Sequence, residues 1–226
     1  MEICFVTENS LNYVWQNDLA SISNSDLVVF GFNGLGLVSY KKELNGETEY
    51  FQDVAKLSKQ LSCTIISGCD TDIYGVFRHS AVIADKGKIL GVTDMAHSID
   101  ESEFVAGGSF RVYDTSSGKI GIIVAEDLFF PETTRILTLC DADIVVCVFK
   151  KMSSAMPLIM LRANAFANGV VSALCSQNYT AVSDVRGNVV FAGSADVMRK
   201  KVKIEKDYHL ISSRRRGLYR EFNSGY

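Results

Sequence analysis

The sequence predicts an α/β fold built from two similar halves, each with a sheet and outer helices. Short apolar runs, typical of buried strands, alternate with amphipathic segments at helical spacing. The order helix, strand and hairpin occurs twice along the chain. No linker or low-complexity segment divides it, so we expect one domain over residues 1–226. Each half must bury an apolar sheet face, and the two sheets are therefore expected to pack face to face with the helices outside.

The first half begins with two strands, predicted for residues 1–6 and 26–30 because most of their side chains are apolar. A helix is expected over residues 48–61, where apolar side chains recur at helical spacing. A strand at residues 64–67 follows. A hairpin over residues 81–91 then completes this half, because its turn sequence D-K-G-K separates two apolar runs.

The second half repeats this order after an additional strand and helix. Pro131 suits the first position of that helix and Glu132 its positive end, and Asp141-Ala142-Asp143 ends it. The remaining expected elements are strands at residues 120–124, 144–149 and 170–175, a helix at 157–168 and a hairpin at 181–193. The second hairpin repeats the first in sequence, since A-V begins each and glycine ends each.

The most informative segment is the turn that begins at Ala125, directly after the apolar run 120–124. Folds of the α/β class place their chemistry at such turns, at the carboxyl end of a strand. The segment closely resembles the nucleophile motif of the nitrilase (carbon-nitrogen hydrolase) superfamily, which reads roughly G-[IV]-x-I-C-x-D-x-x-F-P-E. Ala125 stands at the position of the nucleophilic cysteine. The matching residues are Gly121, Asp127, Phe130, Pro131, Glu132 and Arg135.

Three further patterns extend this resemblance over nearly the whole chain. A pattern like D-[LV]-V-V-x-P-E matches the strand at 26–30, but Phe32 occupies the position of its glutamate. His97 matches the histidine of Y-R-K-x-H, whereas Met95 replaces the lysine. In the segment R-A-x-A-x-E-N, Ala167 replaces the glutamate. The scaffold positions match and the catalytic ones differ.

The resemblance implies a four-layer α-β-β-α sandwich and a reaction in which a cysteine thiolate attacks a nitrile or amide carbon. A glutamate moves the protons and a lysine stabilises the developing negative charge. Phe32 cannot transfer a proton, Met95 carries no charge and Ala125 cannot form an acyl intermediate. We therefore expect a nitrilase-fold protein that is inactive towards nitriles and amides and is retained as a scaffold that binds a ligand or a partner.

Two alternatives stay open. One is an amidase-type carbon-nitrogen hydrolase that acts through non-standard residues, of which Cys147 and Glu126 are the candidates. The other is a structural subunit that pairs with an active homologue. Cys175, at the end of a strand, is also expected near the pocket, together with His97 and Asp127, for which the resemblance implies a structural role. The pocket itself is either absorbed into the core or kept as an apolar cleft.

Composition and spacing exclude several other classes. Asp94 and Glu103 could join the residues at the pocket mouth, but the histidines lack ligand spacing, so neither a metal nor a cofactor is expected. The glycines of segment 31–36 have the wrong spacing for a dinucleotide fingerprint, and we expect a flexible loop there. Six cysteines without a CxxC motif indicate buried thiols in a reducing, cytoplasmic setting. No apolar run approaches the roughly 18 residues of a membrane span.

The charge is distributed unevenly. The net charge of −3 divides into +6 from Arg199 onward and −9 before it. Arg214-Arg215-Arg216 could bind an acidic partner or nucleic acid, although a solvated face or a dimer contact is the favoured interpretation. The resemblance implies association through the helices at 131–139 and 157–168. Because apolar Met156, Leu158 and Met160 surround the second helix, we expect a homodimer.

Overall fold

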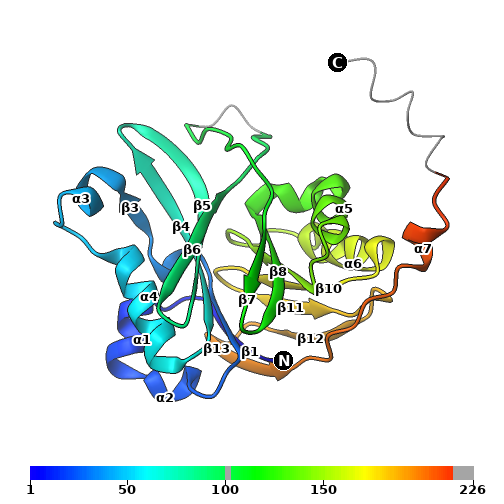
Figure 1. The fold of residues 1–226 in the computed structure, drawn as a ribbon, viewed down its shortest axis with the longest axis horizontal. Helices are drawn as coiled ribbons and strands as arrows, with labels where there is room; N and C mark the ends of the chain where they lie inside the picture. Colours follow the sequence, from blue (N-terminus) through cyan, green and yellow to red (C-terminus); the bar gives the residue numbers. More distant parts are fainter. Residues whose placement is uncertain (100–102, 216–226) are drawn as a thin grey trace.

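The computed structural model describes residues 1–99 and 103–215, and it contains two β-sheets that lie face to face with helices on their outer sides (Figure 1). Sheet A has the strand order β13-β1-β2-β4-β5-β6, with β3 also paired to β4. Sheet B has the order β12-β11-β10-β9-β8-β7. The four layers, helix, sheet, sheet and helix, agree with the predicted α-β-β-α sandwich.

The elements have the following bounds. The strands are β1 (Glu2–Val6), β2 (Leu27–Phe30), β3 (Leu37–Ser39), β4 (Thr64–Ile73), β5 (Val76–Asp85), β6 (Lys88–Asp94), β7 (Val112–Thr115), β8 (Gly118–Val124), β9 (Ile144–Val148), β10 (Val171–Cys175), β11 (Thr180–Ser183), β12 (Val189–Gly193) and β13 (Val197–Lys201). The helices are α1 (Leu11–Asn17), α2 (Leu19–Ile22), α3 (Tyr40–Leu44), α4 (Tyr50–Leu61), α5 (Pro131–Leu139), α6 (Met156–Asn168) and α7 (His209–Ser212), with 3₁₀ helices η1 (Phe32–Gly34) and η2 (Ala125–Phe129). In the described ranges, none of these helices has the length and apolar character needed to cross a membrane.

The predicted repeat of two halves is confirmed by the strand pairing. In sheet A, β1, β2 and β4 are parallel, and β5 and β6 continue the sheet as antiparallel strands. In sheet B, β8, β9 and β10 are parallel, and β11 and β12 continue it in the same way. One antiparallel strand extends each sheet at its other side, β13 beside β1 and β7 beside β8.

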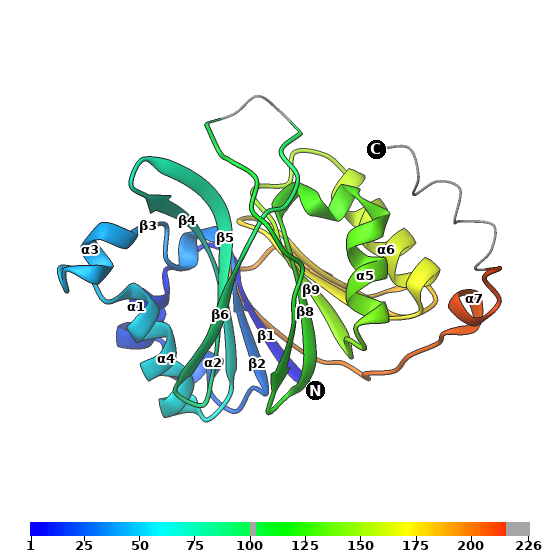
Figure 2. The same cartoon turned by 45° about the horizontal axis from the view of Figure 1, so that its top comes forward.

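Side chains of each strand alternate between two apolar layers. In β1, Ile3 and Phe5 belong to the layer between the sheets, whereas Cys4 and Val6 face α1, α2 and α4. Sheet B behaves in the same way, and its outward side chains pack under α5 and α6. Both faces of every central strand are therefore buried, which explains why these strands read as continuous apolar runs. Figure 2 shows the helices on the two outer sides.

Two segments differ from the sequence expectation. The strand expected at residues 64–67 is longer, because β4 continues to Ile73 and pairs with β5 along its whole length. The flexible loop expected at residues 31–36 contains the 3₁₀ helix η1, in which Phe32 and Gly34 are buried. A Cβ atom at Gly34 would lie 2.2 Å from Ser67 Oγ. A larger side chain would not fit at position 34. This explains why the segment has a glycine there although it is not an open loop.

The segment after β13 crosses from sheet A to the helices that cover sheet B, ending at α7 (Figures 1 and 2). Lys206 fixes it to the end of α5, since Nζ lies 2.7 Å from Asp141 Oδ1 and 2.8 Å from Asp143 Oδ1. The Asp207 N–H also donates to the Gly169 carbonyl at 2.8 Å. Residues 202–208, called the strap below, thus connect sheet A to the outer helices of sheet B on the surface of the molecule.

Gly169→Ala should destabilise the protein mainly through the strap. Gly169 has φ +60, and a Cβ there would lie 1.6 Å from the Asp207 carbonyl oxygen. Gly36 has a similar φ of +64 but no atom within 4 Å of its Cβ position. Both alanine variants should lose about 1 kcal/mol from left-handed strain. We expect Gly169→Ala to lose roughly 2 kcal/mol more through overpacking, as measured by urea unfolding. Equal losses would contradict the strap contact.

Candidate functional site

Ala125 lies in a strained turn at the carboxyl end of β8. Its φ is +49, in the left-handed region that non-glycine residues rarely adopt, and its side chain is fully buried. Holding an alanine there costs about 1–2 kcal/mol. Strain of this kind is often found where a fold positions a reactive group. The backbone therefore has the sharp strand-to-helix turn expected of a nucleophile position, although alanine offers no nucleophile.

Phe32, Met95 and Ala125 belong to one apolar cluster between the two sheets. Phe32 and Met95 are each 3% exposed, and Ala125 is 0% exposed. The Met95 N–H donates to the His79 carbonyl at 2.8 Å, and the Phe32 ring packs edge-on against the His79 ring at 5.6 Å between centroids. The three positions that the sequence patterns align with the catalytic triad thus lie in packed core, with no charged side chain among them.

Asp127 joins the turn after β8 to the segment after β6. Its carboxylate accepts hydrogen bonds from the Ala96 N–H at 2.8 Å and the His97 N–H at 2.9 Å, and it lies 2.7 Å from His97 Nδ1. Burial raises the pKa of Asp127, and the hydrogen bonds to its carboxylate oppose that rise. The His97 ring in turn stacks on Phe130 at 3.9 Å. These contacts fix the loop that carries Met95 against the turn that carries Ala125.

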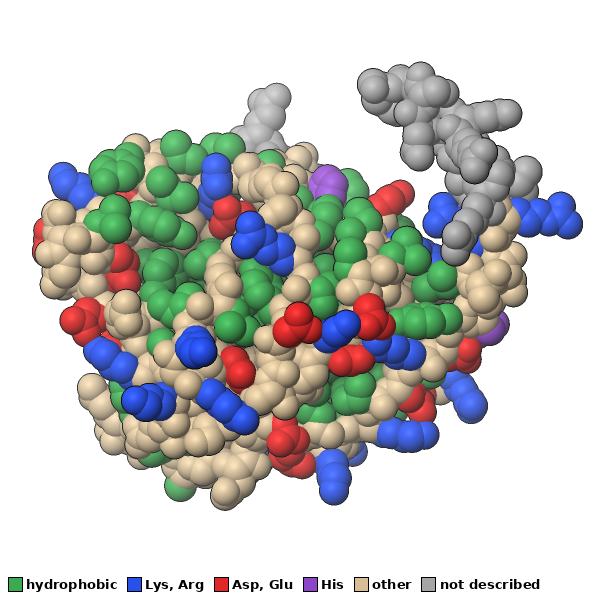
Figure 3. Space-filling model, in the orientation of Figure 1, with side chains coloured by type: hydrophobic (Ala, Val, Ile, Leu, Met, Phe, Trp, Pro, Cys, Tyr) green, Lys and Arg blue, Asp and Glu red, His purple; other side chains and the backbone are tan. Residues whose placement is uncertain are grey.

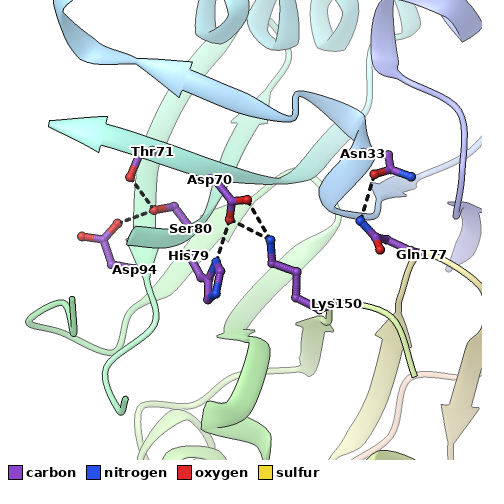
Figure 4. A network of polar contacts seen from close by, with 8 residues as sticks. All are labelled: Asn33, Asp70, Thr71, His79, Ser80, Asp94, Lys150 and Gln177. Carbon is purple, nitrogen blue, oxygen red and sulfur yellow. Dashed lines mark hydrogen bonds and ion pairs between the residues drawn. The ribbon is translucent and has the colours of Figure 1, made fainter. Parts of the chain in front are cut away.

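A second polar cluster consists of Asp70, His79 and Lys150 (Figure 4). It is called the rim cluster below, because it lies where the two sheets meet and its side chains are partly exposed. Asp70 and His79 face each other in the β4–β5 pairing, and His79 Nδ1 lies 2.6 Å from Asp70 Oδ1. Lys150, just after β9 in sheet B, donates to the same carboxylate at 2.8 and 2.9 Å. The cluster therefore ties sheet A to sheet B. Asn33 and Gln177 make a further hydrogen bond between the two halves at 2.9 Å.

Aromatic rings lie against Lys150 and His79 of this rim cluster. Lys150 Nζ lies 4.2 Å from the centroid of the Phe32 ring, and the His79 ring stacks on Phe104 at 3.8 Å. A cation over a ring face is attracted by the ring quadrupole. Burial alone would raise the pKa of Asp70, but the hydrogen bonds from His79 and Lys150 outweigh it and hold the pKa below its usual value. Lys150 and the ionised Asp70 thus cover the ring that stands at the expected glutamate position.

The two candidate cysteines are fully buried in strands. Cys175 belongs to the layer between the sheets, but Cys147 lies on the other face of sheet B, under α5 and α6. Burial raises the pKa of each thiol well above its ordinary value. A nucleophilic cysteine needs an electropositive and accessible surrounding. Lys150, two residues after β9, pairs with Asp70, and the negative charges of Asp127 and Glu126 raise the pKa of Cys147 further.

The other predicted pocket residues do not form one group. Of these, His97 and Asp127 are in contact, whereas Asp94 bonds instead to Arg78 at 2.9 Å and to Ser80 at 2.8 Å. Glu126 is partly exposed and Glu103 is exposed. Within residues 1–99 and 103–215, no group of three or more His, Cys, Asp or Glu side chains is arranged to hold a metal ion.

The fold, the strained turn after β8 and the position of Asp127 agree with one family. The carbon-nitrogen hydrolase family profile matches residues 16–207, which is most of the chain. The chain belongs to the carbon-nitrogen hydrolase family. A probable nitrilase of Schizosaccharomyces pombe is 27% identical over 127 residues, covering 54% of this chain and 47% of that protein. The match thus spans about half the length of this curated relative.

Solved structures of the nitrilase superfamily share the whole fold. A carbon-nitrogen hydrolase from Helicobacter pylori G27 superposes with a TM-score of 0.81 and 18% identity, over 99% of this chain and 98% of that one. The NitN amidase from Nesterenkonia sp. AN1 has a TM-score of 0.79 and 16% identity, over 98% of this chain and 99% of that one. At such low identity, the likeness to these structures establishes the fold alone.

Sequence reasoning did not find the rim cluster. The signal was present in the β4–β5 hairpin, whose turn residues Tyr74 and Gly75 both have positive φ, as a two-residue hairpin turn requires. Counting back from that turn places Asp70 opposite His79. The contribution of Lys150 could not be found in this way, because it comes from the other sheet and is 80 residues from Asp70 in the chain.

Ala125→Gly should leave the stability unchanged or raise it by up to about 1 kcal/mol. Glycine adopts positive φ without strain, and this gain offsets the lost methyl group and the added entropy of the unfolded chain. Ala173→Gly is the matched control, because Ala173 is equally buried but lies in β10. The control should lose about 1–2 kcal/mol. Thermal unfolding measures both; equal losses would mean that Ala125 is not strained.

Asp70→Asn should destabilise the protein at neutral pH but not in acid. Because the pKa of Asp70 is lowered by folding, its contribution is present above the unfolded pKa of about 4 and is lost as the pH falls through the folded value. We expect a loss of about 1–2 kcal/mol at pH 7. Urea unfolding at pH 7, 5 and 3 should show the difference from wild type shrinking. Asp114→Asn, at an exposed site, is the control; a pH-independent loss for Asp70→Asn would refute the ion cluster.

Proposed function

We propose that this carbon-nitrogen hydrolase fold is not a hydrolase of nitriles or amides and acts as a scaffold for binding. One observation carries the proposal: Phe32, Met95 and Ala125 occupy the positions aligned with the catalytic glutamate, lysine and cysteine, and all three are buried in one apolar cluster. Covalent acyl transfer needs at least a nucleophile and a base to activate it. Neither is present among these three side chains.

The packing of the cluster also speaks against a substrate at this position. A Cβ atom at Gly68 would lie 2.5 Å from Val148 Cγ1 and 3.1 Å from the Phe32 Cα. The backbones of η1 and β4 therefore approach each other closely beside Phe32, and the Val148 side chain of β9 fills the remaining space at Gly68. This favours a site absorbed into the core over an apolar cleft kept for a ligand. A binding function is then expected on the outer surface.

Catalysis through non-standard residues has little support. Both candidate thiols are protonated at neutral pH, because burial raises their pKa. The Cys175 thiol also lies 3.6 Å from the carbonyl oxygens of Val6 and Val29, contacts that favour the neutral S–H form. Glu126 could move a proton, but a base without a nucleophile or an oxyanion donor does not make an acyl-transfer site.

Incubation with amides and nitriles should leave the protein unmodified. Propionamide and propionitrile are suitable small substrates, and intact-mass spectrometry would detect an acyl adduct. We expect no adduct and no release of ammonia. An adduct of one equivalent mapped to Cys147 or Cys175, together with turnover, would overturn the proposal. Cys147→Ser and Cys175→Ser variants would then identify which thiol reacts.

The same proposal includes assembly of two copies through α5 and α6. Exposed apolar side chains gather on these helices, with Leu139 58% exposed on α5 and Ile159 50% and Phe166 48% exposed on α6. Of the residues named from sequence, Met156 is also exposed, but Leu158 and Met160 pack partly against the core. Large exposed apolar patches commonly mark protein contacts.

Ile159→Glu should convert a homodimer into a monomer. A carboxylate in the centre of an apolar contact would be desolvated without a partner. Light scattering coupled to size exclusion at micromolar concentration measures the mass of each form. Leu37→Glu is the control, because Leu37 is 56% exposed on β3, in the other half of the molecule. A wild-type monomer, or a dimer unaffected by Ile159→Glu, would exclude this assembly.

A further inference from the structure

A groove of about 690 Å³ lies on the outside of the molecule, away from the positions aligned with the triad. Its walls come from the first turn of α5, the last turn of α6 and the chain around α7. Its volume falls within the roughly 300–1,000 Å³ typical of sites for small molecules. None of the contacts described above for the core or the rim cluster involves this groove.

The groove is basic although the chain as a whole is acidic. Arg135, Arg214 and Arg215 line it, and Glu132 is the one acidic side chain among its described lining residues. The net charge of the chain is −3. Figure 3 shows Lys and Arg side chains gathered beside the end of the described chain. Arginine presents several N–H donors in a planar fork that suits phosphate and carboxylate oxygens.

The first turn of α5 adds to this positive character. Pro131 begins the helix, and the preceding Phe130 provides no side chain that caps it. The positive end of the helix dipole favours anions. Arg135, one turn later on the same helix, is held in place because its Nη2 donates to the Ala167 carbonyl at 3.0 Å. The positive end of α5 and the positioned Arg135 side chain thus both favour an anion in the groove.

Asn168 supplies an independent sign of a ligand. It lines the groove and is 1% exposed. Its Nδ2 donates to the Asn164 carbonyl at 2.8 Å, but no described residue donates to its Oδ1. Buried acceptors normally receive a hydrogen bond, and an exception calls for an explanation such as a missing ligand. A hydroxyl or amine group in the groove would satisfy it.

Ala167 changes the chemistry of this groove relative to the sequence pattern that it otherwise matches. The pattern R-A-x-A-x-E-N has a glutamate at this position, whereas this chain has alanine. The groove therefore contains one carboxylate fewer next to Arg135, and a smaller side chain on its wall. Both changes favour entry of an anion, since like charge is removed and space is gained.

We propose that this groove binds a small organic phosphate monoester. Its phosphoryl group lies among the three arginines and the first turn of α5, and its organic part carries hydroxyl groups that donate to Asn168 Oδ1 and Glu132. Leu210 and Pro131 give this part an apolar wall. The inference goes beyond the proposed scaffold function and does not depend on it. A failure to bind phosphate would not show that the protein hydrolyses nitriles or amides.

Calorimetric titration of the full chain tests the proposal with three probes: glycerol 3-phosphate, inorganic phosphate and glycerol. We expect glycerol 3-phosphate to bind one per chain, more tightly than inorganic phosphate, and glycerol not to bind. Arg214→Gln and Arg215→Gln should each weaken binding about tenfold, because each removes charge-assisted hydrogen bonds. Arg111→Gln, at an exposed arginine outside the groove, should leave the affinity unchanged.

Ala167→Glu provides the sharpest variant. It restores the carboxylate of the sequence pattern at a partly exposed position on the groove wall, and should abolish phosphate binding without lowering the melting temperature. Binding that is equal in this variant and in the wild type would overturn the proposal, and so would the absence of saturable binding to the wild type. Tighter binding of an acidic peptide such as acetyl-Asp-Glu-Asp would also overturn it and assign the groove to a protein partner.

Discussion

Both sheets turn one face inward, and the side chains from these two faces fill a single apolar layer. A charge placed in this layer must be paired and hydrogen-bonded, or it destabilises the fold by several kcal/mol. Phe32, Met95 and Ala125 lie in that layer at the place where the family's motifs would put a glutamate, a lysine and a cysteine. Replacing two opposite charges together by apolar groups avoids both the desolvation penalty and an unpaired partner. The core at this position is therefore continuous with the rest of the layer.

Charge is found instead at the rim, where water remains accessible. Asp70, His79 and Lys150 each keep some exposure, and their contacts join β4 and β5 of sheet A to the end of β9 in sheet B. Lys150 covers the ring of Phe32 with its ammonium group. The apolar layer and the rim cluster support each other, since the ring that fills the core also provides the surface on which the cation rests.

The turn after β8 keeps a strained geometry, with an alanine at its first position. Ala125 keeps a positive φ, and Asp127 keeps two backbone N–H groups and the His97 ring in place. These contacts hold the loop after β6 against the turn after β8, so they stabilise the fold whether or not a nucleophile is present. The outer surface is less constrained, because side chains there need not fill a closed layer. Both proposed binding surfaces, the α5–α6 face and the basic groove, lie on it.

The sequence by itself determined the order of elements and the repeat of two halves. It also aligned Ala125, Phe32 and Met95 with the motif positions of the cysteine, the glutamate and the lysine. Both follow from the sequence because periodicity and local motifs are properties of neighbouring residues. The sequence also indicated the solvent-facing arginines of the C-terminal segment. Only the tertiary structure decided that Cys147 faces the helices, that Asp70, His79 and Lys150 meet, and that Arg135 and Arg214 line one groove. Such contacts join residues far apart in the chain. They depend on how two sheets and a strap pack, which no local pattern encodes.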